Sequence, residues 1–262
     1  MKRREQKLVD LDLISSEVVR LVTDRIHNLD APVHPEFLHR VETFSRALVA
    51  WGARMNLTAH PEDPAEVAFH ILDSLAPVMM ANRSPLEGAF DLGREALDLG
   101  GGAGFPGLIL AAAADARFTI AESRRKRASF LTVAIAEMGL DNASVMAGRV
   151  DESTFHVKRQ TTLHRIAGHR PAGKFVKNVS RETSAGFDVV LARAFGAPTD
   201  FYRIAAVALR SGGLAILYAN PDQRLSLDIA RESGLTGYTR IPYEVRRGVS
   251  TVKRVLAVWR RA

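Results

Sequence analysis

The 262-residue sequence contains no cysteine. Disulfide bonds and metal sites built from thiolates are therefore excluded, and a reducing cytoplasm is the default expectation for the location of the chain. The eight histidines form no ordered cluster in the sequence, so no metal site is predicted.

Long hydrophobic runs are also missing. The apolar stretches around 108–114 and 128–136 are interrupted or flanked by charges, and they fall short of the about 18 to 20 residues that a membrane-spanning helix needs. No transmembrane helix is predicted. The first seven residues are basic, but Asp10 and Asp12 follow where a signal peptide would need an unbroken apolar segment. We interpret 1–7 as a solvated arm.

The charge balance is positive: 36 Lys and Arg residues against 29 Asp and Glu residues give a formal net charge of +7. This surplus favours a polyanionic partner, because each phosphate neutralised by Lys or Arg releases condensed counterions. Nucleic acid is one such partner, although many basic proteins bind nothing acidic. The length and the 47% hydrophobic content predict one main α/β domain with a small addition, and a monomer without an obligate protein partner is the default expectation.

Residues 1–82 are predicted to form an N-terminal helical extension. Large apolar residues recur at alternating spacings of four and three over Glu36–Trp51, which places them on one face of an amphipathic helix. A second helix is predicted over Ala65–Met80, before the polar break at Asn82–Pro85.

From 83 to 262 the pattern changes to short apolar runs that alternate with helical segments. This alternation predicts a doubly wound α/β sheet with helices on both faces. The predicted strands, all interpreted as buried, are Ala96–Leu99, Phe118–Ala121, Ser144–Met146, Phe187–Ala192 and Leu214–Tyr218. The predicted helices are Gly107–Ala114, Lys126–Met138 closed by Gly139, and Thr199–Leu209 closed by Ser211–Gly213. Two extended runs over Gly237–Trp259, joined through Arg246-Arg247-Gly248, predict an antiparallel hairpin at the sheet edge.

One segment departs from this alternation. From Ser153 to Gly186 there is little strand or helix periodicity, and basic residues far outnumber acids. A compact domain rarely contains so long a loop without a functional or disordered reason. Two interpretations of this basic insertion stay open: a solvated segment, or a segment that contacts RNA phosphates.

A glycine-rich turn follows the first predicted strand. In Leu97-Asp98-Leu99-Gly100-Gly101-Gly102-Ala103-Gly104, the glycines let the backbone approach a nucleotide-like ligand closely, so Gly100 and Gly102 are candidate cofactor-binding residues. A dinucleotide fingerprint needs Gly-x-Gly-x-x-Gly, but here the third glycine comes one position early, at Gly104. The shorter spacing resembles methyltransferase motif I. A tight turn without a ligand is the alternative.

Acids follow the next two predicted strands. Glu122 stands at about the distance downstream at which nucleotide-binding α/β folds place an acid on the ribose hydroxyls, so it is the candidate ribose ligand. Its alternative role is pairing with Arg124, Arg125 or Lys126. Asp151 comes after the third strand, where its backbone or side chain would meet the adenine, or where it would cap a helix.

Six motifs then occur in a fixed order along the chain. They are Met55–Thr58, His70–Leu75, Asp98–Gly107, Lys126–Leu131, Arg149–Glu152 and Phe187–Phe195. This ordered set resembles the 16S rRNA guanine-N7 methyltransferase family (RsmG, historically glucose-inhibited division protein B), and the likeness covers about 40–218. The resemblance implies a class I methyltransferase with a Rossmann-like sheet and an N-terminal helical extension. It also implies S-adenosyl-L-methionine as cofactor, and a guanine in the 530 loop of 16S rRNA, free or in the small ribosomal subunit, as substrate.

Carried over motif by motif, the resemblance implies a set of site residues. Gly100 and Phe105 look like contacts of the cofactor loop, and Val150 and Asp151 like contacts on the adenine side. Arg193 looks like a residue at the junction of the cofactor and substrate pockets.

The sequence departs from the family pattern at three places. Glu122 stands where the family usually has Asp, and one additional methylene should preserve the ribose contact. Tyr218-Ala219 occupies the end of a strand where a Lys-Gly pair is expected, and the basic insertion replaces a much shorter connection. A methyltransferase of the same fold that acts on another RNA or a small molecule is therefore the alternative function. A non-catalytic rRNA-binding assembly factor and a dehydrogenase are disfavoured by the intact glycines and by their spacing, respectively.

The chemistry implied by the resemblance needs alignment more than a general base, because guanine N7 attacks with a lone pair and loses no proton. We expect Arg193 to orient the guanine or a neighbouring phosphate, since its planar fork donates two hydrogen bonds. A structural ion pair with Asp188 or another acid is the alternative. His70 and Asp73, three residues apart on one helix face, are expected to pack against each other or the neighbouring domain rather than to act in catalysis.

Overall fold

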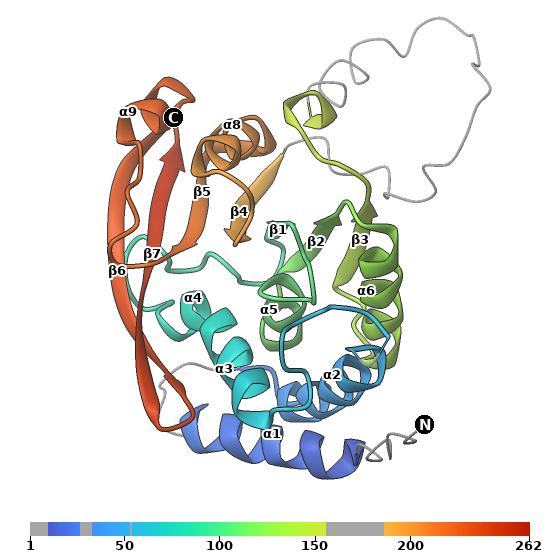
Figure 1. Ribbon diagram of the computed structural model, residues 1–262. Coiled ribbons are helices and arrows are strands. Elements are labelled where there is room, and N and C mark those ends of the chain that lie inside the picture. Colours follow the sequence, from blue (N-terminus) through green and yellow to red (C-terminus); the bar gives the residue numbers. More distant parts are fainter. Residues whose placement is uncertain (1–9, 27–32, 53, 156–185) are drawn as a thin grey trace, which may run out of the picture.

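The computed structural model describes residues 10–26, 33–52, 54–155 and 186–262, which contain a seven-stranded sheet in the order β3-β2-β1-β4-β5-β7-β6 (Figure 1). The strands are β1 (Glu95–Leu99), β2 (Arg117–Glu122), β3 (Ala143–Ala147), β4 (Phe187–Arg193), β5 (Leu209–Ala219), β6 (Leu235–Arg247) and β7 (Ser250–Arg261). β1 to β5 run parallel to one another, whereas β7 pairs antiparallel with both β5 and β6. The predicted α/β sheet, its five strands and its edge hairpin are confirmed.

The apolar sequences of the central strands reflect cover on both faces of the sheet. Six of the seven residues of β4 are buried, and so are four of the five in β1, as expected for parallel strands between two helical layers. The prediction that β3 is buried was wrong. In the described part of the chain β3 forms the edge of the sheet, and its side chains stay half-buried or exposed.

The helices that follow β1 in the chain lie in two layers, one on each face of the sheet, as predicted. α5 (Gly107–Ala113) and α6 (Arg125–Glu137) contribute to one hydrophobic cluster, and α8 (Pro198–Ala208) and α9 (Leu227–Glu232) contribute to a second one. The layers change where the chain passes from the β1–β3 half to the β4–β5 half. This is the switch point at which open α/β sheets bind their ligands, outside the carboxyl ends of the strands.

One predicted helix end was wrong. α8 ends at Ala208, and β5 begins directly at Leu209, so that Ser211–Gly213 lie inside the strand rather than closing the helix. Leu209 has extended backbone angles and pairs with Phe187, because the sheet register, and not the glycines, sets the end of the helix.

The segment predicted as an N-terminal helical extension contains α1 (Leu11–Ile26), α2 (Phe37–Gly52), α3 (Pro64–Ser74) and α4 (Ala76–Met79) among the described residues. The prediction of one helix over 65–80 was wrong, because α3 and α4 are separate helices joined at Leu75. Pro77 explains the break, since proline has no backbone N–H and its ring clashes with the carbonyl four residues earlier in a continuous helix. The apolar face of α2, including Phe37, Val41, Phe44 and Leu48, is buried, which confirms the predicted amphipathic helix.

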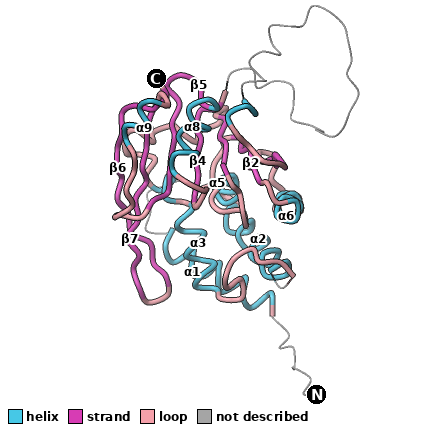
Figure 2. The backbone as a smooth tube through the Cα atoms, turned by 45° about the horizontal axis from the view of Figure 1, so that its top comes forward, coloured by secondary structure: helices cyan, strands magenta, loops and turns pink. Residues whose placement is uncertain are grey.

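The hairpin of β6 and β7 is longer than predicted and extends beyond the sheet. β5 pairs only with Val255–Arg260 of β7, so the part of the hairpin nearest its turn projects past the other strands and reaches the N-terminal extension, where β6 contacts α3 (Figures 1 and 2). α3 is thereby packed between the end of the sheet and the hairpin.

The predicted arm at 1–7 and most of the basic insertion at 153–186 lie outside the described residues. Within the described ranges, no helix combines the length and the apolar character needed to cross a membrane.

Candidate functional site

A cavity of about 540 Å³ opens at the carboxyl ends of the parallel strands. The register explains its position: Leu99 of β1 pairs with Ala121 of β2 and Ala192 of β4, so the turns after these strands meet at one edge of the sheet. Its lining comes from the turns after β1, β2, β3 and β4 and from the first turns of α8. Gly100, Glu122, Val150 and Asp151, all predicted from the sequence, are brought together there.

The turn after β1 needs glycine at its first position. Gly100 has a φ of +82°, in the left-handed region, and a Cβ atom there would lie 2.9 Å from Cδ2 of Phe195. A side chain at residue 100 would therefore be strained and would displace an aromatic ring. Without one, the backbone of this turn borders the cavity directly.

Glu122 is a buried carboxylate at the end of β2, with 5% of its surface exposed. Its Oε2 accepts a hydrogen bond from the backbone N–H of Gly102 at 2.9 Å, and its Oε1 accepts one from the backbone N–H of Arg124 at 2.7 Å. The alternative of a side-chain pair with the neighbouring basic residues does not occur: the described ion pairs of the chain include none to Glu122. Glu122 thus joins the turn after β1 to the turn after β2, and each oxygen keeps a second lone pair for a ligand.

Asp151 caps the short helix at 152–155, as one of the two interpretations held. Its Oδ1 accepts hydrogen bonds from Oγ of Ser153 at 2.6 Å and from the backbone N–H of Thr154 at 3.2 Å. The hydrogen bond from Ser153 is the main reason why the pKa of Asp151 lies below its usual value of 3.8. Capping does not remove Asp151 from the cavity, because it and Val150 both line it.

Two predicted cofactor contacts and the predicted positioning residue lie outside the cavity lining. Gly102 borders Glu122 through its amide. Phe105 is buried, with its ring centroid 5.3 Å from that of Phe44 and 5.2 Å from that of His70. The guanidinium carbon of Arg193 lies 5.2 Å from the centroid of the Phe105 ring. The roles of Gly102, Phe105 and Arg193 toward a cofactor stay predictions.

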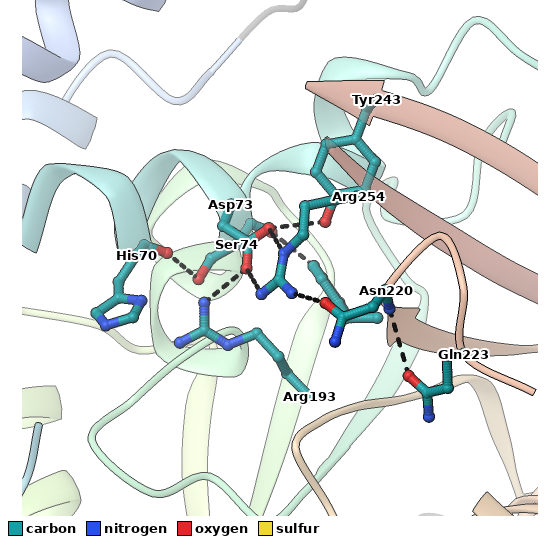
Figure 3. A network of polar contacts seen from close by, with 9 residues as sticks. His70, Asp73, Ser74, Arg193, Asn220, Gln223, Tyr243 and Arg254 are labelled. Carbon is teal, nitrogen blue, oxygen red and sulfur yellow. Dashed lines mark hydrogen bonds and ion pairs between the residues drawn. The ribbon is translucent and has the colours of Figure 1, made fainter. Parts of the chain in front are cut away.

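Arg193, the last residue of β4, belongs to a buried polar network that Figure 3 shows. Its Nη1 donates to Oδ2 of Asp73, on α3, at 2.9 Å, and the side chain of Asp73 is fully buried. Nη2 of Arg254 donates to the same oxygen at 3.2 Å, and the hydroxyl of Tyr243 donates to Oδ1 of Asp73 at 2.8 Å. One carboxylate therefore joins α3, β4, β6 and β7.

The alternative that Arg193 pairs with an acid is correct, but Asp188 was the wrong partner to name. Asp188 is at the other end of β4, where it pairs with Arg94 at 3.0 Å and with Arg210, and accepts from the backbone N–H of Glu95 at 2.9 Å. Of the two contacts expected for Asp73, the contact with a neighbouring part of the fold is confirmed, since its partners lie in the sheet and the hairpin.

The charges in the network determine its ionisation. Burial alone would raise the pKa of Asp73, but the guanidinium groups of Arg193 and Arg254 outweigh it and hold that pKa below 3.8. Burial and the neighbouring Asp73 carboxylate raise the pKa of the Tyr243 hydroxyl far above 10, so it remains a hydrogen-bond donor. Asp73 with its two arginines leaves one positive charge in excess at this end of β4.

Asp98 is a buried acid to which the sequence analysis assigned no role of its own. It is fully buried at the end of β1, and Oδ2 accepts from the backbone N–H of Gly107 at 2.9 Å. Its Oδ1 has no hydrogen-bond partner among the described residues. Burial raises its pKa to about 7. An acid inside the apolar strand Glu95–Leu99 was the sequence signal for such a group.

Tyr218, the departure from the family pattern, has a structural partner. It is buried at the end of β5, and its hydroxyl donates to the backbone carbonyl of Ser74, at the end of α3, at 2.7 Å. Tyr218 therefore fixes α3 over the sheet beside the Asp73 network, and it does not line the cavity.

A family profile described as rRNA small subunit methyltransferase G (GidB) matches residues 38–231. A protein from Acidiphilium cryptum named ribosomal RNA small subunit methyltransferase G is 38% identical over 156 residues, which are 58% of this chain and 66% of that protein. A protein of the same name from Burkholderia mallei is 34% identical over 181 residues, 68% of this chain and 66% of that protein. The matched part of the chain thus spans just under two thirds of the length of these relatives.

Among solved structures, the O-methyltransferase from Bacillus cereus in complex with SAH has the same fold. The TM-score is 0.50 at 15% sequence identity, and the similarity covers 94% of this chain and 100% of that one. At this level of identity the likeness concerns the fold alone, and it agrees with the class I methyltransferase sheet expected from the sequence.

Proposed function

The chain belongs to the rRNA small subunit methyltransferase G family, and from this premise we propose that it transfers a methyl group from S-adenosyl-L-methionine to N7 of a guanine in the 530 loop of 16S rRNA. The observation that carries the proposal is the cavity at the carboxyl ends of β1 to β4, in which Gly100, Glu122, Val150 and Asp151 meet. Gly100, Val150 and Asp151 are residues that the family resemblance assigns to the cofactor, and Glu122 is the candidate ribose ligand from its position after β2.

The residues of the cavity fit S-adenosyl-L-methionine by size and chemistry. A volume of about 540 Å³ is within the range of small-molecule sites. Glu122 offers carboxylate oxygens for ribose hydroxyls, and the turn at Gly100 offers backbone without a side chain in the way. When bound, this cofactor supplies an electrophilic methyl group on a sulfonium.

The chain itself needs to supply alignment rather than proton transfer. N7 of guanine uses a lone pair and releases no proton, so the reaction does not depend on a general base. The positioning role of Arg193 is supported by the rigid setting of its side chain, with Nη1 on Asp73 and the guanidinium over the Phe105 ring. Its Nε and Nη2 have no hydrogen bond to another described residue, which leaves them as donors for guanine O6 or a phosphate.

RNA as the acceptor is supported by the charge of the chain and of the cavity rim. The formal net charge is +7, and Arg124, Arg149 and Arg203 line the cavity, where they are available to phosphates. The alternative of a changed substrate began from Tyr218. Because Tyr218 binds Ser74 and lies outside the cavity lining, its presence gives that alternative no support from the site.

The proposal is tested by transfer of radiolabelled methyl from S-adenosyl-L-methionine to small ribosomal subunits and to free 16S rRNA from cells that lack the endogenous modification, with the labelled nucleotide mapped. We expect N7-methylguanine in the 530 loop. Glu122→Ala serves as a variant impaired in the cavity. Cofactor binding without RNA labelling would refute the proposed acceptor and leave another acceptor or a non-catalytic role.

A further inference from the structure

Most of the predicted cofactor-binding residues lie toward one end of the cavity, because Glu122 follows β2 and Val150 and Asp151 follow β3, whereas Gly100, after β1, lies between them and Phe195. Val150 follows β3, whereas Phe195 and Asp200 follow β4. Three strand spacings in the order β3-β2-β1-β4 separate these ends, or about 14 Å at about 4.8 Å between neighbouring strands. A nucleoside held at Glu122 and Val150 thus leaves the β4 end of the same cavity for a second ligand.

We propose that Phe195 and Asp200 form the subsite for the target guanine, in which the base stacks on the Phe195 ring and the Asp200 carboxylate accepts hydrogen bonds from N1–H and the N2 amino group. This inference rests on the proposed function and adds the residues that select the acceptor base. Holding the base by this edge leaves N7, on its other side, free to face the methyl donor.

The Phe195 ring is held firmly enough to serve as a stacking surface. It is half-buried, packs against the apolar cluster on the α8 side of the sheet, and also borders the cavity. Its Cδ2 lies close to Gly100, where a Cβ atom would be 2.9 Å away. The backbone before and after it is left-handed, with φ of +55° at Ala194 and +43° at Gly196. Alanine rarely adopts this conformation, so the turn directs the ring at a local cost.

An aromatic ring at a nucleic-acid enzyme's pocket is a platform on which an unstacked base can rest. Stacking alone accepts every base, because each has an aromatic face. Selection of guanine therefore needs a polar group at the same end of the cavity.

Asp200 provides that group. It lies in the first turn of α8, is exposed, and lines the cavity beside Phe195. Its carboxylate has no hydrogen bond or ion pair to any residue that the structure describes. A carboxylate has only acceptors, which match the two adjacent donors of guanine, N1–H and N2–H. Adenine presents an acceptor at N1 instead, so that edge would meet the carboxylate with a repulsive contact.

α9 offers a matched control for Asp200. Asp228 is also in the first turn of its helix and also exposed, but it does not line the cavity. It differs from Asp200 in an ion pair with Arg231 at 3.7 Å, which is exposed on both sides and therefore contributes little to stability. An acid that only favours the helix N-terminus through the helix dipole would act equally at both positions. The pair Asp200→Asn and Asp228→Asn thus separates a role in base selection from a role in helix stability.

The experiment measures kcat/KM on small ribosomal subunits that lack the modification, and on the same subunits with adenine in place of the target guanine. We expect Phe195→Leu to lower kcat/KM on guanine by about 10- to 100-fold, and Phe195→Tyr to recover most of the loss. Asp200→Asn should cost about 10- to 100-fold on guanine. Asp200→Asn should also reduce the ratio of kcat/KM on guanine to kcat/KM on adenine, because an amide can donate a hydrogen bond to adenine N1. Asp228→Asn should match the wild type.

Calorimetric binding of S-adenosylhomocysteine separates this subsite from the cofactor site. We expect each variant to bind it within about threefold of the wild type. Equal losses of cofactor affinity and turnover, or unchanged kcat/KM and base preference in Phe195→Leu and Asp200→Asn, would overturn the subsite while wild-type RNA methylation stands. A wild-type protein that labels no RNA would overturn the proposed function and the subsite with it.

Discussion

Replacing Asp73 by Asn removes one negative charge and almost no volume, so it tests whether the buried network holds both the fold and Arg193. Asp73 is fully buried, and the side chains of Arg193 and Arg254 are 13% and 21% exposed. Breaking a buried ion pair from one side costs about 3 to 5 kcal/mol, because a charge is left without a partner. Here two guanidinium groups lose their common carboxylate, so we expect a loss of about 3 kcal/mol or more in the free energy of unfolding.

The assay is urea unfolding of Asp73→Asn and the wild type at pH 7, together with methyl transfer below the unfolding transition. Because Arg193 loses its anchor, we expect kcat/KM to fall by about 10- to 100-fold, as small misplacements in an active site do. The arginines hold the pKa of Asp73 below the unfolded value of 3.8. The stabilisation is therefore complete above pH 3.8, and it is lost as the pH falls through the lower folded-state pKa.

Asp188→Asn is the matched control. Asp188 is buried, is 5% exposed and also serves two arginines, Arg94 and Arg210, but at the opposite end of β4. Because the side chains of Arg94 and Arg210 are 44% and 41% exposed and water can solvate them, this variant should lose less stability than Asp73→Asn, and it should keep its kcat/KM when assayed as folded protein. A loss of less than about 1 kcal/mol in Asp73→Asn, or equal losses of methyl transfer in both variants, would refute the reasoning.

Three further outcomes are expected. Burial raises the pKa of Asp98 from 3.8 to about 7, so between these pH values the folded protein keeps a proton that the unfolded chain releases, and the wild type loses this stability as the pH rises from about 4 to about 7. Over that range the free energy of unfolding of Asp98→Asn, measured in urea, should rise by up to about 4 kcal/mol relative to the wild type. A difference that does not depend on pH would contradict this. Glu122→Ala should weaken S-adenosylhomocysteine binding by about 10-fold or more in calorimetry, because the carboxylate holds the turns after β1 and β2 and also faces the cavity. An unchanged affinity would show that Glu122 does not take part in cofactor binding. Tyr218→Phe should lower the free energy of unfolding by about 1 to 3 kcal/mol, because the buried carbonyl of Ser74 loses its donor, whereas an effect on cofactor affinity alone would show that the hydroxyl acts elsewhere.

The fold could be predicted where a local pattern had one structural meaning. The apolar run Phe187–Ala192 lies in a strand covered on both sides, and the face of α2 is buried as its spacing indicates. The run Ser144–Met146 looks the same in sequence, but it lies at the sheet edge. Its burial depends on neighbours that the sequence does not specify. Pro77 marks the break between α3 and α4, but the apolar residues on both sides of it favour one continuous helix in the sequence.

The candidate site could likewise be predicted only where a local sequence pattern had one structural meaning. Gly100, Glu122 and Asp151 could be brought together from the sequence because each follows a parallel strand, and such strand ends meet at one edge. The partner of Arg193 could not be found in this way. Asp188 is five residues away in the chain and Asp73 is 120 residues away, and only the packing of α3 over the strand ends decides between them. A buried acid on the apolar helix Pro64–Ser74 was the one local signal.

The long chain separations in the Asp73 network have a consequence for the order of folding. Arg193 and Arg254 are 120 and 181 residues from Asp73, whereas Gly102 and Glu122, which join two turns of the cavity, are only 20 residues apart. Contacts between distant residues pay a larger loop-closure entropy and tend to form late. The half of the cavity near β1 and β2 can therefore become ordered while α3 is still unattached. A partly folded chain would then hold a nucleoside before Arg193 is in place, and the ability to methylate would mark completion of the fold more strictly than the ability to bind.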